Sequence, residues 1–72
     1  MAMRWKRVTS SVIASIGYDT KSMTLGVRFK SGAIYEYYSV DPDTVRAFQS
    51  ASSKGRFFRA EIKDLFENDR VR

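Results

Sequence analysis

Apolar and polar residues alternate through much of the first forty positions, which is the pattern of half-buried β-strands. The alternation is clearest over residues 23–29, and residues 11–18 and 33–39 are rich in the β-branched and aromatic residues that strands favour. Short polar turns at residues 19–22 and 30–32 predict a three-stranded antiparallel meander. Ile13 falls on one face of that sheet, and the apolar set falls on the other: Val12, Ala14, Ile16, Tyr18, Met23, Leu25, Val27 and Phe29.

Beyond residue 40 the apolar spacing becomes helical. Asp41 is a typical N-cap and Pro42 suits the first helical position, which predicts a helix of about ten residues. A second helix, capped by Ser52 or Ser53, is expected to run to about residue 66 and to turn four apolar residues to one face: Phe58, Ile62, Leu65 and Phe66. The order β-β-β-α-α indicates an α+β fold with both helices packed on one face of the sheet.

The loop at residues 30–32 sets the register of the second hairpin. A three-residue loop with Gly32 last suits a turn that ends in a left-handed residue. This register places Tyr35 and Tyr37 under the helices and leaves Tyr38 outside. A two-residue loop would reverse the faces and would bury the carboxylate of Glu36, which is costly.

Composition limits the functions that the chain can have. Histidine and cysteine are absent from its 72 residues, which removes the usual acid/base group at neutral pH, a thiol nucleophile and common metal ligands. We expect no catalysis, metal, cofactor or small-molecule substrate. The absence of cysteine fits a cytoplasmic protein, and no apolar run reaches the roughly 18 residues of a membrane span.

The charge is unevenly distributed along the chain. We divide the chain into a basic N-terminal arm (1–9), one domain (10–67) and a C-terminal tail (68–72). The net charge is +5, and the arm contributes three basic residues and no acid. A positive balance favours polyanionic partners, chiefly nucleic acid.

Two basic segments are candidate nucleic-acid contacts. The arm contains Arg4, Trp5, Lys6 and Arg7, and such a mixture of cations and a ring binds phosphates and stacks on bases. Equally, Trp5 can fold back and enlarge the core. On a regular second helix one flank carries only cations: Arg56, Arg59 and Lys63.

The start of the second helix is open to two interpretations. Backbone N–H groups near Gly55, together with Lys54 and Arg56, can bind a phosphate. A plain Ser53 cap explains the same residues. Among the aromatic residues, Tyr38 is the candidate for a ring that stacks on bases, whereas Tyr35 and Tyr37 are expected in the core.

Several short motifs, in order, resemble the KTSC domain family. They are Gly17-Tyr18-Asp19, LGVRFKSG, the Tyr-x-Tyr motif at Tyr35 and Tyr37, and Ser53-Lys54-Gly55-Arg56-Phe57-Phe58. The family includes small bacterial and phage proteins and the C-termini of some lysyl-tRNA synthetases, so the resemblance implies a role in RNA binding. Val40-Asp41-Pro42 has one residue more than the usual family pattern, and the C-terminal end departs from it.

These observations predict a non-catalytic module that binds nucleic acid, with RNA or single strands as the expected partner. The alternative is a protein-interaction or oligomerisation module. A homodimer is predicted as well, joined through the first strand or through the face of the sheet that the helices leave open.

Overall fold

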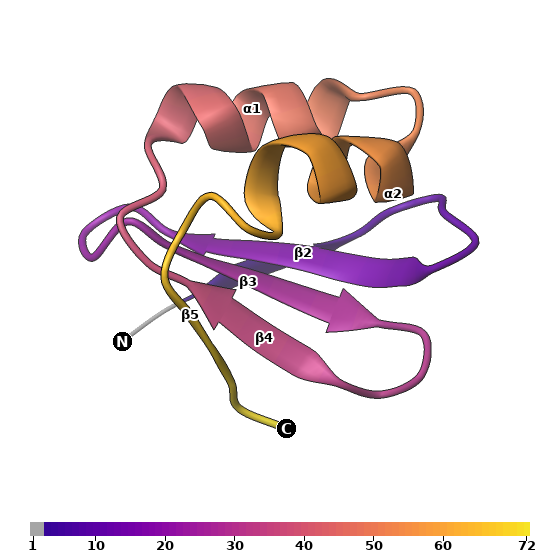
Figure 1. Ribbon diagram of the computed structural model, residues 1–72, viewed down its shortest axis with the longest axis horizontal. Coiled ribbons are helices and arrows are strands. Elements are labelled where there is room, and N and C mark those ends of the chain that lie inside the picture. The colour runs from indigo at the N-terminus through magenta and orange to yellow at the C-terminus, as the bar shows by residue number, and fades with distance from the viewer. Residues whose placement is uncertain (1–2) are drawn as a thin grey trace.

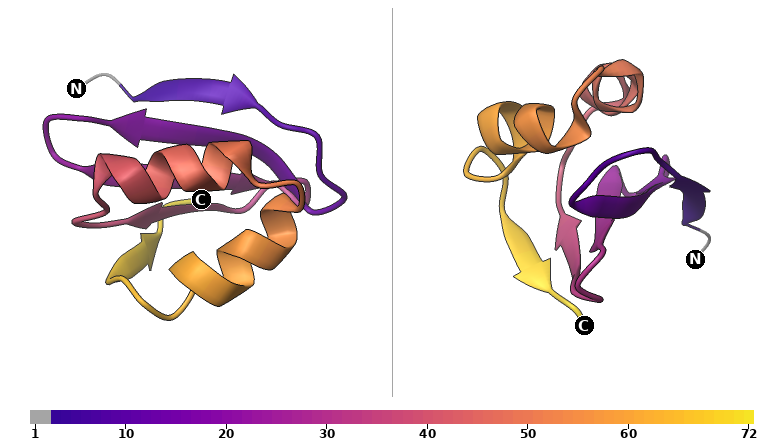
Figure 2. Two further views of the ribbon diagram at one scale, coloured as in Figure 1. Left: turned by 90° about the horizontal axis from the view of Figure 1, so that it is seen from above. Right: turned by 90° about the vertical axis from the view of Figure 1, so that its right-hand side faces the viewer.

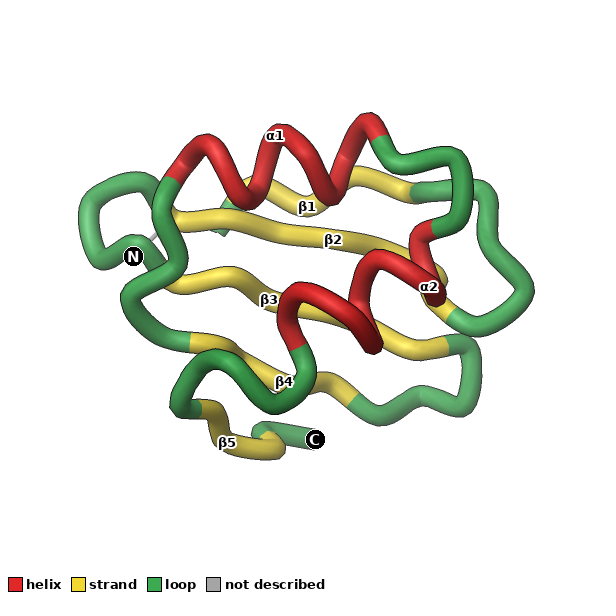
Figure 3. Tube along the Cα trace, turned by 45° about the horizontal axis from the view of Figure 1, so that its top comes forward, coloured by secondary structure: helices red, strands yellow, loops and turns green. Residues whose placement is uncertain are grey.

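The computed structural model describes residues 3–72 and contains one antiparallel sheet with helices on one of its faces (Figures 1 and 2). The strands are β1 (Arg4–Arg7), β2 (Ile13–Asp19), β3 (Thr24–Phe29), β4 (Ile34–Tyr37) and β5 (Asn68–Arg70), in that spatial order (Figure 3). The helical segments are α1 (Pro42–Ser50), α2 (Lys54–Phe57) and the π-helical turn η1 (Phe58–Ile62), which continues α2. The predicted α+β class and the helix-covered face are confirmed, but over residues 3–72 the sheet has five strands rather than three.

The two strands that the prediction missed are the edges of the sheet. β1 lies in the predicted arm and pairs with β2, with Trp5 opposite Gly17. β5 lies in the predicted tail and pairs with β4, with Asp69 opposite Glu36. Both strands are short, charged and exposed, so neither shows an apolar alternation. Their pairing satisfies backbone groups of β2 and β4 that would otherwise be unpaired. Met1 and Ala2 of the predicted arm lie outside the described residues.

The hairpin between β3 and β4 has the predicted register. Val27 lies opposite Tyr35 and Leu25 lies opposite Tyr37. Gly32 has a φ of +100°, as the three-residue loop requires. The same turn is closed by hydrogen bonds from the Phe29 and Gly32 backbone N–H groups. Tyr35 and Tyr37 therefore face the helices.

A bulge near the start of β2 corrects the predicted faces of that strand. The pairing with β3 shifts between Ile13 and Ser15, which inserts one extra residue. As a result Ile13 and Ile16 are both fully buried in the core, whereas Val12 is exposed. The strict alternation assumed from the sequence had placed Val12 on the apolar face of the strand and Ile13 on the opposite face.

The first helix follows the prediction and the second does not. The carboxylate of Asp41 caps α1 by accepting a hydrogen bond from the backbone N–H of Thr44. After Ile62 the chain leaves the helix and turns toward β5, so the predicted helix to residue 66 is four residues too long. Leu65, predicted on the buried face, is 65% exposed.

The core lies between the helices and the sheet. It is closed near the start of α1 by the hydroxyl of Tyr18, which donates a hydrogen bond to the backbone oxygen of Val40 at 2.5 Å. The fully buried side chains come from β2, β3, the segment before α1, α1 and η1: Ile13, Ile16, Leu25, Val27, Val40, Phe48 and Ile62. No helix among residues 3–72 is long and apolar enough to cross a membrane.

The open face of the sheet is partly covered by Trp5. Gly17 and Gly26 lie opposite each other in β2 and β3, and a Cβ atom built on either would lie within 2.7 Å of a Trp5 ring carbon. The indole therefore fills the space that these glycines leave. It stays 39% exposed, and the Arg28 guanidinium lies 5.6 Å from the ring centroid. Trp5 therefore folds back onto the domain, which was one of the two interpretations of the arm.

β2 is an interior strand, which changes the expected dimer. It pairs with β1 on one side and with β3 on the other. The predicted pairing of two copies through residues 11–18 is therefore wrong, because β1 occupies that edge. A homodimer joined through the open face stays a prediction.

Candidate nucleic-acid interface

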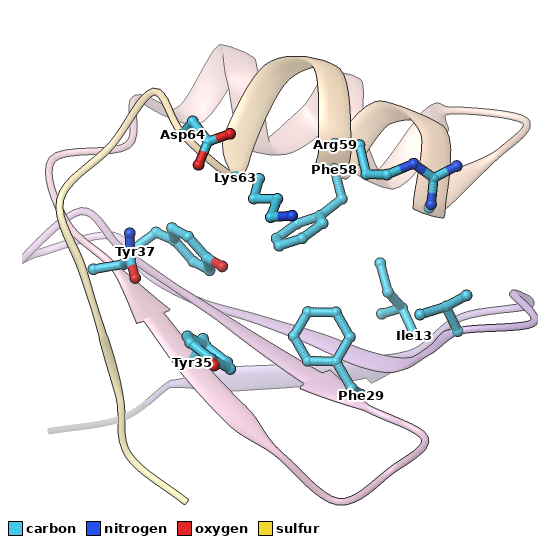
Figure 4. Close-up of a pocket in the computed structure, with 11 residues that line it drawn as sticks. Ile13, Phe29, Tyr35, Tyr37, Phe58, Arg59, Lys63 and Asp64 are labelled. Carbon is cyan, nitrogen blue, oxygen red and sulfur yellow. The ribbon is translucent and has the colours of Figure 1, made fainter.

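A cleft of about 400 Å³ separates η1 from the strands β3 and β4. Phe29, Tyr35 and Tyr37 line its sheet side (Figure 4). Phe58, Arg59 and Lys63 line the helical side. The volume lies within the usual range for ligand pockets. Both tyrosines of the Tyr-x-Tyr motif thus line this cleft.

The rings of the cleft pack against one another. The Phe58 ring lies 5.6 Å from Tyr37 and 5.3 Å from Phe29, both in edge-to-face geometry, and the Tyr35 and Tyr37 rings are stacked at 6.3 Å. Such contacts hold the rings in fixed positions. Tyr37 is buried, whereas Phe29 and Tyr35 are only half-buried. The cleft is therefore a preformed aromatic surface that still has exposed ring area.

The hydroxyl of Tyr37 remains neutral in this environment. Burial, and then the neighbouring charges of Tyr35 and Asp64, raise the pKa of Tyr37 to about 12. At physiological pH the group can donate or accept a hydrogen bond, but it cannot act as an anionic base. This chemistry suits binding more than proton abstraction.

Two cations form the lip of the cleft on its helical side. Arg59 and Lys63 are both exposed, and Lys63 follows a π-helical turn closed by its backbone N–H bond to the Phe58 oxygen at 2.9 Å. Inserted π turns are frequent at functional sites. Asp64 and Asn68 also line the cleft, so its polar groups include acceptors as well as cations.

The predicted basic flank of the second helix is divided in the structure. Arg59 and Lys63 line the aromatic cleft, but Arg56 lines a separate hollow together with Glu61. The division has a simple reason, since the flank was drawn on a regular helix and the observed segment changes to π geometry at Phe58.

The motif around Gly55 has the predicted cap. The Ser53 hydroxyl accepts a hydrogen bond from the Arg56 backbone N–H at 3.3 Å. The Lys54 ammonium donates to the backbone oxygen of Ala51 at 2.5 Å, which ties α2 to the end of α1. Gly55 lines the cleft beside Arg59. A phosphate contact at Lys54 and Arg56 stays a prediction.

The remaining candidate residues lie away from the cleft. Trp5 lies on the open face, and the cations Arg4, Lys6 and Arg7 lie on the β1 edge. The Tyr38 hydroxyl donates to the Asp69 carboxylate at 3.1 Å and so links the end of β4 to β5. Burial and that hydrogen bond raise the pKa of Tyr38. The structure thus brings neither β1 nor Tyr38 together with the Tyr-x-Tyr motif.

The sequence did not identify Phe29, Asp64 and Asn68 as site residues. Phe29 has the alternation of a core residue, and Asp64 lies outside the apolar face and the basic flank predicted for the second helix. Asn68 carries no signal, because its place depends on β5 pairing with β4. The tertiary fold brings all three residues to the cleft.

The comparisons with known proteins establish the family. The KTSC domain family model matches residues 9–66, and the chain belongs to this family. A crystal structure of a KTSC domain protein from Yersinia pestis has a TM-score of 0.95 and 39% sequence identity to this chain. The structural match covers 99% of this chain and 100% of the Yersinia pestis chain.

Sequence relatives include stand-alone and much longer proteins. An uncharacterized protein from Stutzerimonas stutzeri is 45% identical over 60 residues, which are 81% of this chain and 84% of that protein. A lysine–tRNA ligase from Nostoc punctiforme is 38% identical over 61 residues, or 85% of this chain. The match spans only 11% of the length of that ligase.

Proposed function

We propose that this KTSC domain is a non-catalytic, cytoplasmic RNA-binding module whose cleft between β3–β4 and η1 receives single-stranded RNA. The observation that carries the proposal is the pairing of half-buried rings with two exposed cations in one cleft. Aromatic rings stack on unpaired bases, and lysine and arginine neutralise the phosphates between them.

The surroundings of the cleft support this function over catalysis. The chain has no histidine or cysteine, and the Tyr37 hydroxyl is neutral at physiological pH. The cleft therefore offers hydrogen bonds, ring surface and positive charge, which are the components of nucleic-acid binding. The similarity to lysine–tRNA ligases agrees with a partner made of RNA.

Fluorescence anisotropy with a labelled single-stranded oligoribonucleotide tests the proposal. The folded chain should bind at about 50 mM salt and should lose affinity steeply by about 200 mM, because phosphate contacts release counterions. A chain that is folded by circular dichroism and does not bind at the lower salt concentration would contradict the proposed function.

A different surface favours the alternative of self-association. Trp5 lies on the open face of the sheet and is 39% exposed. Exposed aromatic area of this kind is common at protein interfaces. Light scattering at a chain concentration of about 100 μM checks this function: a dimer that Trp5→Ser dissociates supports it, and the mass of a single chain counts against it.

A further inference from the structure

A second hollow, of about 230 Å³, lies beside the aromatic cleft and is lined mainly by hydroxyl groups. Its walls come from residues 9–12 before β2 and from residues 52–55 at the start of α2. Thr9 and four serines supply the hydroxyls, and Lys54 and Arg59 supply positive charge. None of the described residues that line this hollow is acidic. Its chemistry therefore suits an anion.

Two of the serine oxygens accept hydrogen bonds from backbone N–H groups. The oxygen of Ser10 accepts hydrogen bonds from the backbone N–H groups of Val12 and Ile13, at 3.2 and 3.1 Å. The oxygen of Ser53 accepts one from the Arg56 backbone N–H at 3.3 Å. These bonds occupy oxygen lone pairs, so the hydroxyl protons remain available to an acceptor such as a phosphate oxygen.

The two hollows are joined. Val12, Gly55 and Arg59 line both of them. A Cβ atom built on Gly55 would meet only the Arg59 guanidinium, at 3.6 Å. Because Gly55 has no side chain, nothing from this position divides the space, and the Arg59 guanidinium lies at the junction.

The two ends of the joined space differ in the groups that line them. Asp64 and Asn68 line the aromatic cleft and not the hydroxyl-lined hollow. Figure 4 shows Arg59 and Asp64 at opposite ends of the helical wall, with the rings of Tyr35 and Phe29 on the other side. The acceptor groups of Asp64 and Asn68 thus lie toward one end, the hydroxyl groups and Lys54 lie at the other, and Lys63 lies between Asp64 and Arg59.

We propose that the two hollows form one site for a nucleoside phosphate, an inference that rests on the proposed RNA-binding function. The base lies against the aromatic cleft and the phosphate lies in the hydroxyl-lined hollow. Arg59 bridges the two parts, and Asp64 accepts hydrogen bonds from the base or the ribose. The shared chemistry belongs to a free mononucleotide and to one unpaired nucleotide of a strand.

Nuclear magnetic resonance titration of the full chain with adenosine 5′-monophosphate tests the site. The backbone amides of residues 53–55 and those of Tyr35, Tyr37 and Phe58 should shift together with one dissociation constant. Adenosine, which lacks the phosphate, should bind at least tenfold more weakly. Shifts confined to only one of the two hollows, or equal affinities for the nucleotide and adenosine, would overturn the two-part site.

A substitution at the junction provides a test that does not depend on unfolding. Gly55→Leu fills the shared space, and leucine favours the helix more than glycine does. It should weaken nucleotide binding at least tenfold without lowering the melting temperature. Ala60→Leu is the matched control, because this residue lines the separate hollow near Arg56. If Gly55→Leu binds as tightly as Ala60→Leu, the proposed site is wrong.

The same titration with a single-stranded oligoribonucleotide distinguishes the sources and separates this inference from the proposed function. An oligonucleotide that gives the mononucleotide's shifts, and is weakened by Gly55→Leu, places a strand nucleotide in the site. Mononucleotide binding without oligonucleotide binding supports the site but overturns the RNA-binding function. Oligonucleotide binding that shifts only residues of β1 supports RNA binding and overturns the two-part site.

Discussion

Aromatic side chains and an arginine lie together on each face of the sheet, but the space beside the rings is filled on only one of the two faces. On the open face the Trp5 indole fills the gap over Gly17 and Gly26, and Arg28 lies over the ring. On the helix-covered face the rings of Phe29 and Tyr35 are held by Phe58 and the neighbouring tyrosine, yet a cleft of about 400 Å³ remains beside Arg59. On the open face Trp5 and Arg28 pack against each other within the chain, whereas on the helix-covered face the rings and Arg59 leave space for a ligand.

This difference shows that residue type alone does not indicate a binding site. The arm with Trp5 has the composition of a nucleic-acid contact, but its ring packs on the sheet of its own chain. The tyrosine motif has the alternation of a core strand, but it lines an open cleft. What separates them is whether the space next to the rings is already filled.

Removing the buried ring of the cleft should have the largest effect on stability. Tyr37 is 3% exposed and packs against Phe58 and Tyr35, so Tyr37→Ala should cost about 3–5 kcal/mol, near the whole stability of so small a domain. Tyr35→Ala should cost less, because that ring is half-buried. Chemical denaturation measures both losses.

Tyr37→Phe is the control for that substitution, since it keeps the ring and removes only the hydroxyl. It should unfold close to the wild type. An alanine variant that is as stable as the phenylalanine variant would show that the Tyr37 ring is not part of the core.

A side chain added at Gly26, under the Trp5 ring, should disturb the open face of the sheet and leave the cleft unchanged. A Cβ atom on Gly26 would lie 2.6 Å from the Met3 sulfur and 2.7 Å from a Trp5 ring carbon. Gly26→Val should therefore displace the indole at a cost of about 1–3 kcal/mol, shift tryptophan emission to longer wavelength and leave RNA binding intact. Unchanged emission would contradict the packing of Trp5 on the glycines.

High pH should weaken the helix-covered face. The pKa of Tyr37 rises from 10.0 to about 12 in the folded state, so its contribution to stability is complete below pH 10 and is lost as the pH rises toward 12. Tyr18 and Tyr38 also have raised pKa values, so the wild type is compared with Tyr37→Phe. Melting temperatures between about pH 8 and pH 11.5 should fall further for the wild type. Equal falls would count against a buried Tyr37 hydroxyl.

The smallest effect is expected at the β4–β5 edge. Tyr38→Phe removes an exposed hydrogen bond to Asp69, so the variant should unfold nearly like the wild type. Amide hydrogen exchange in β5 should become faster, while the cleft is unaffected. Unchanged exchange in residues 68–70 would show that backbone pairing alone holds this strand.

The parts of the fold that the sequence predicted are those specified by local chemistry. Gly32 at the end of its loop set the register that faces Tyr35 and Tyr37 toward the helices. Asp41 followed by a proline marked the start of α1. In both places one residue type is needed for a local backbone geometry, so the signal lies in a few adjacent positions.

The parts that the sequence did not predict depend on distant partners. β1 and β5 are charged, exposed strands whose pairing is supplied by β2 and β4. The bulge that buries Ile13 and the π turn that ends the helical segment at Ile62 both change a regular period. The cleft depends on β5, the bulge and the π turn together, which is why its tyrosines were predicted as core and its cations as one flank of a regular helix.

The central claim is that RNA binds at the cleft and not at the basic edge of the sheet. Oligoribonucleotide affinity is measured against salt for two double variants that each remove two positive charges: Arg59→Gln with Lys63→Gln at the cleft, and Lys6→Gln with Arg7→Gln on β1. The cleft variant should lose affinity and lower the slope of log affinity against log salt by about 1.4, whereas the β1 variant should keep both close to wild type. The reverse ranking, in folded variants, would contradict the account.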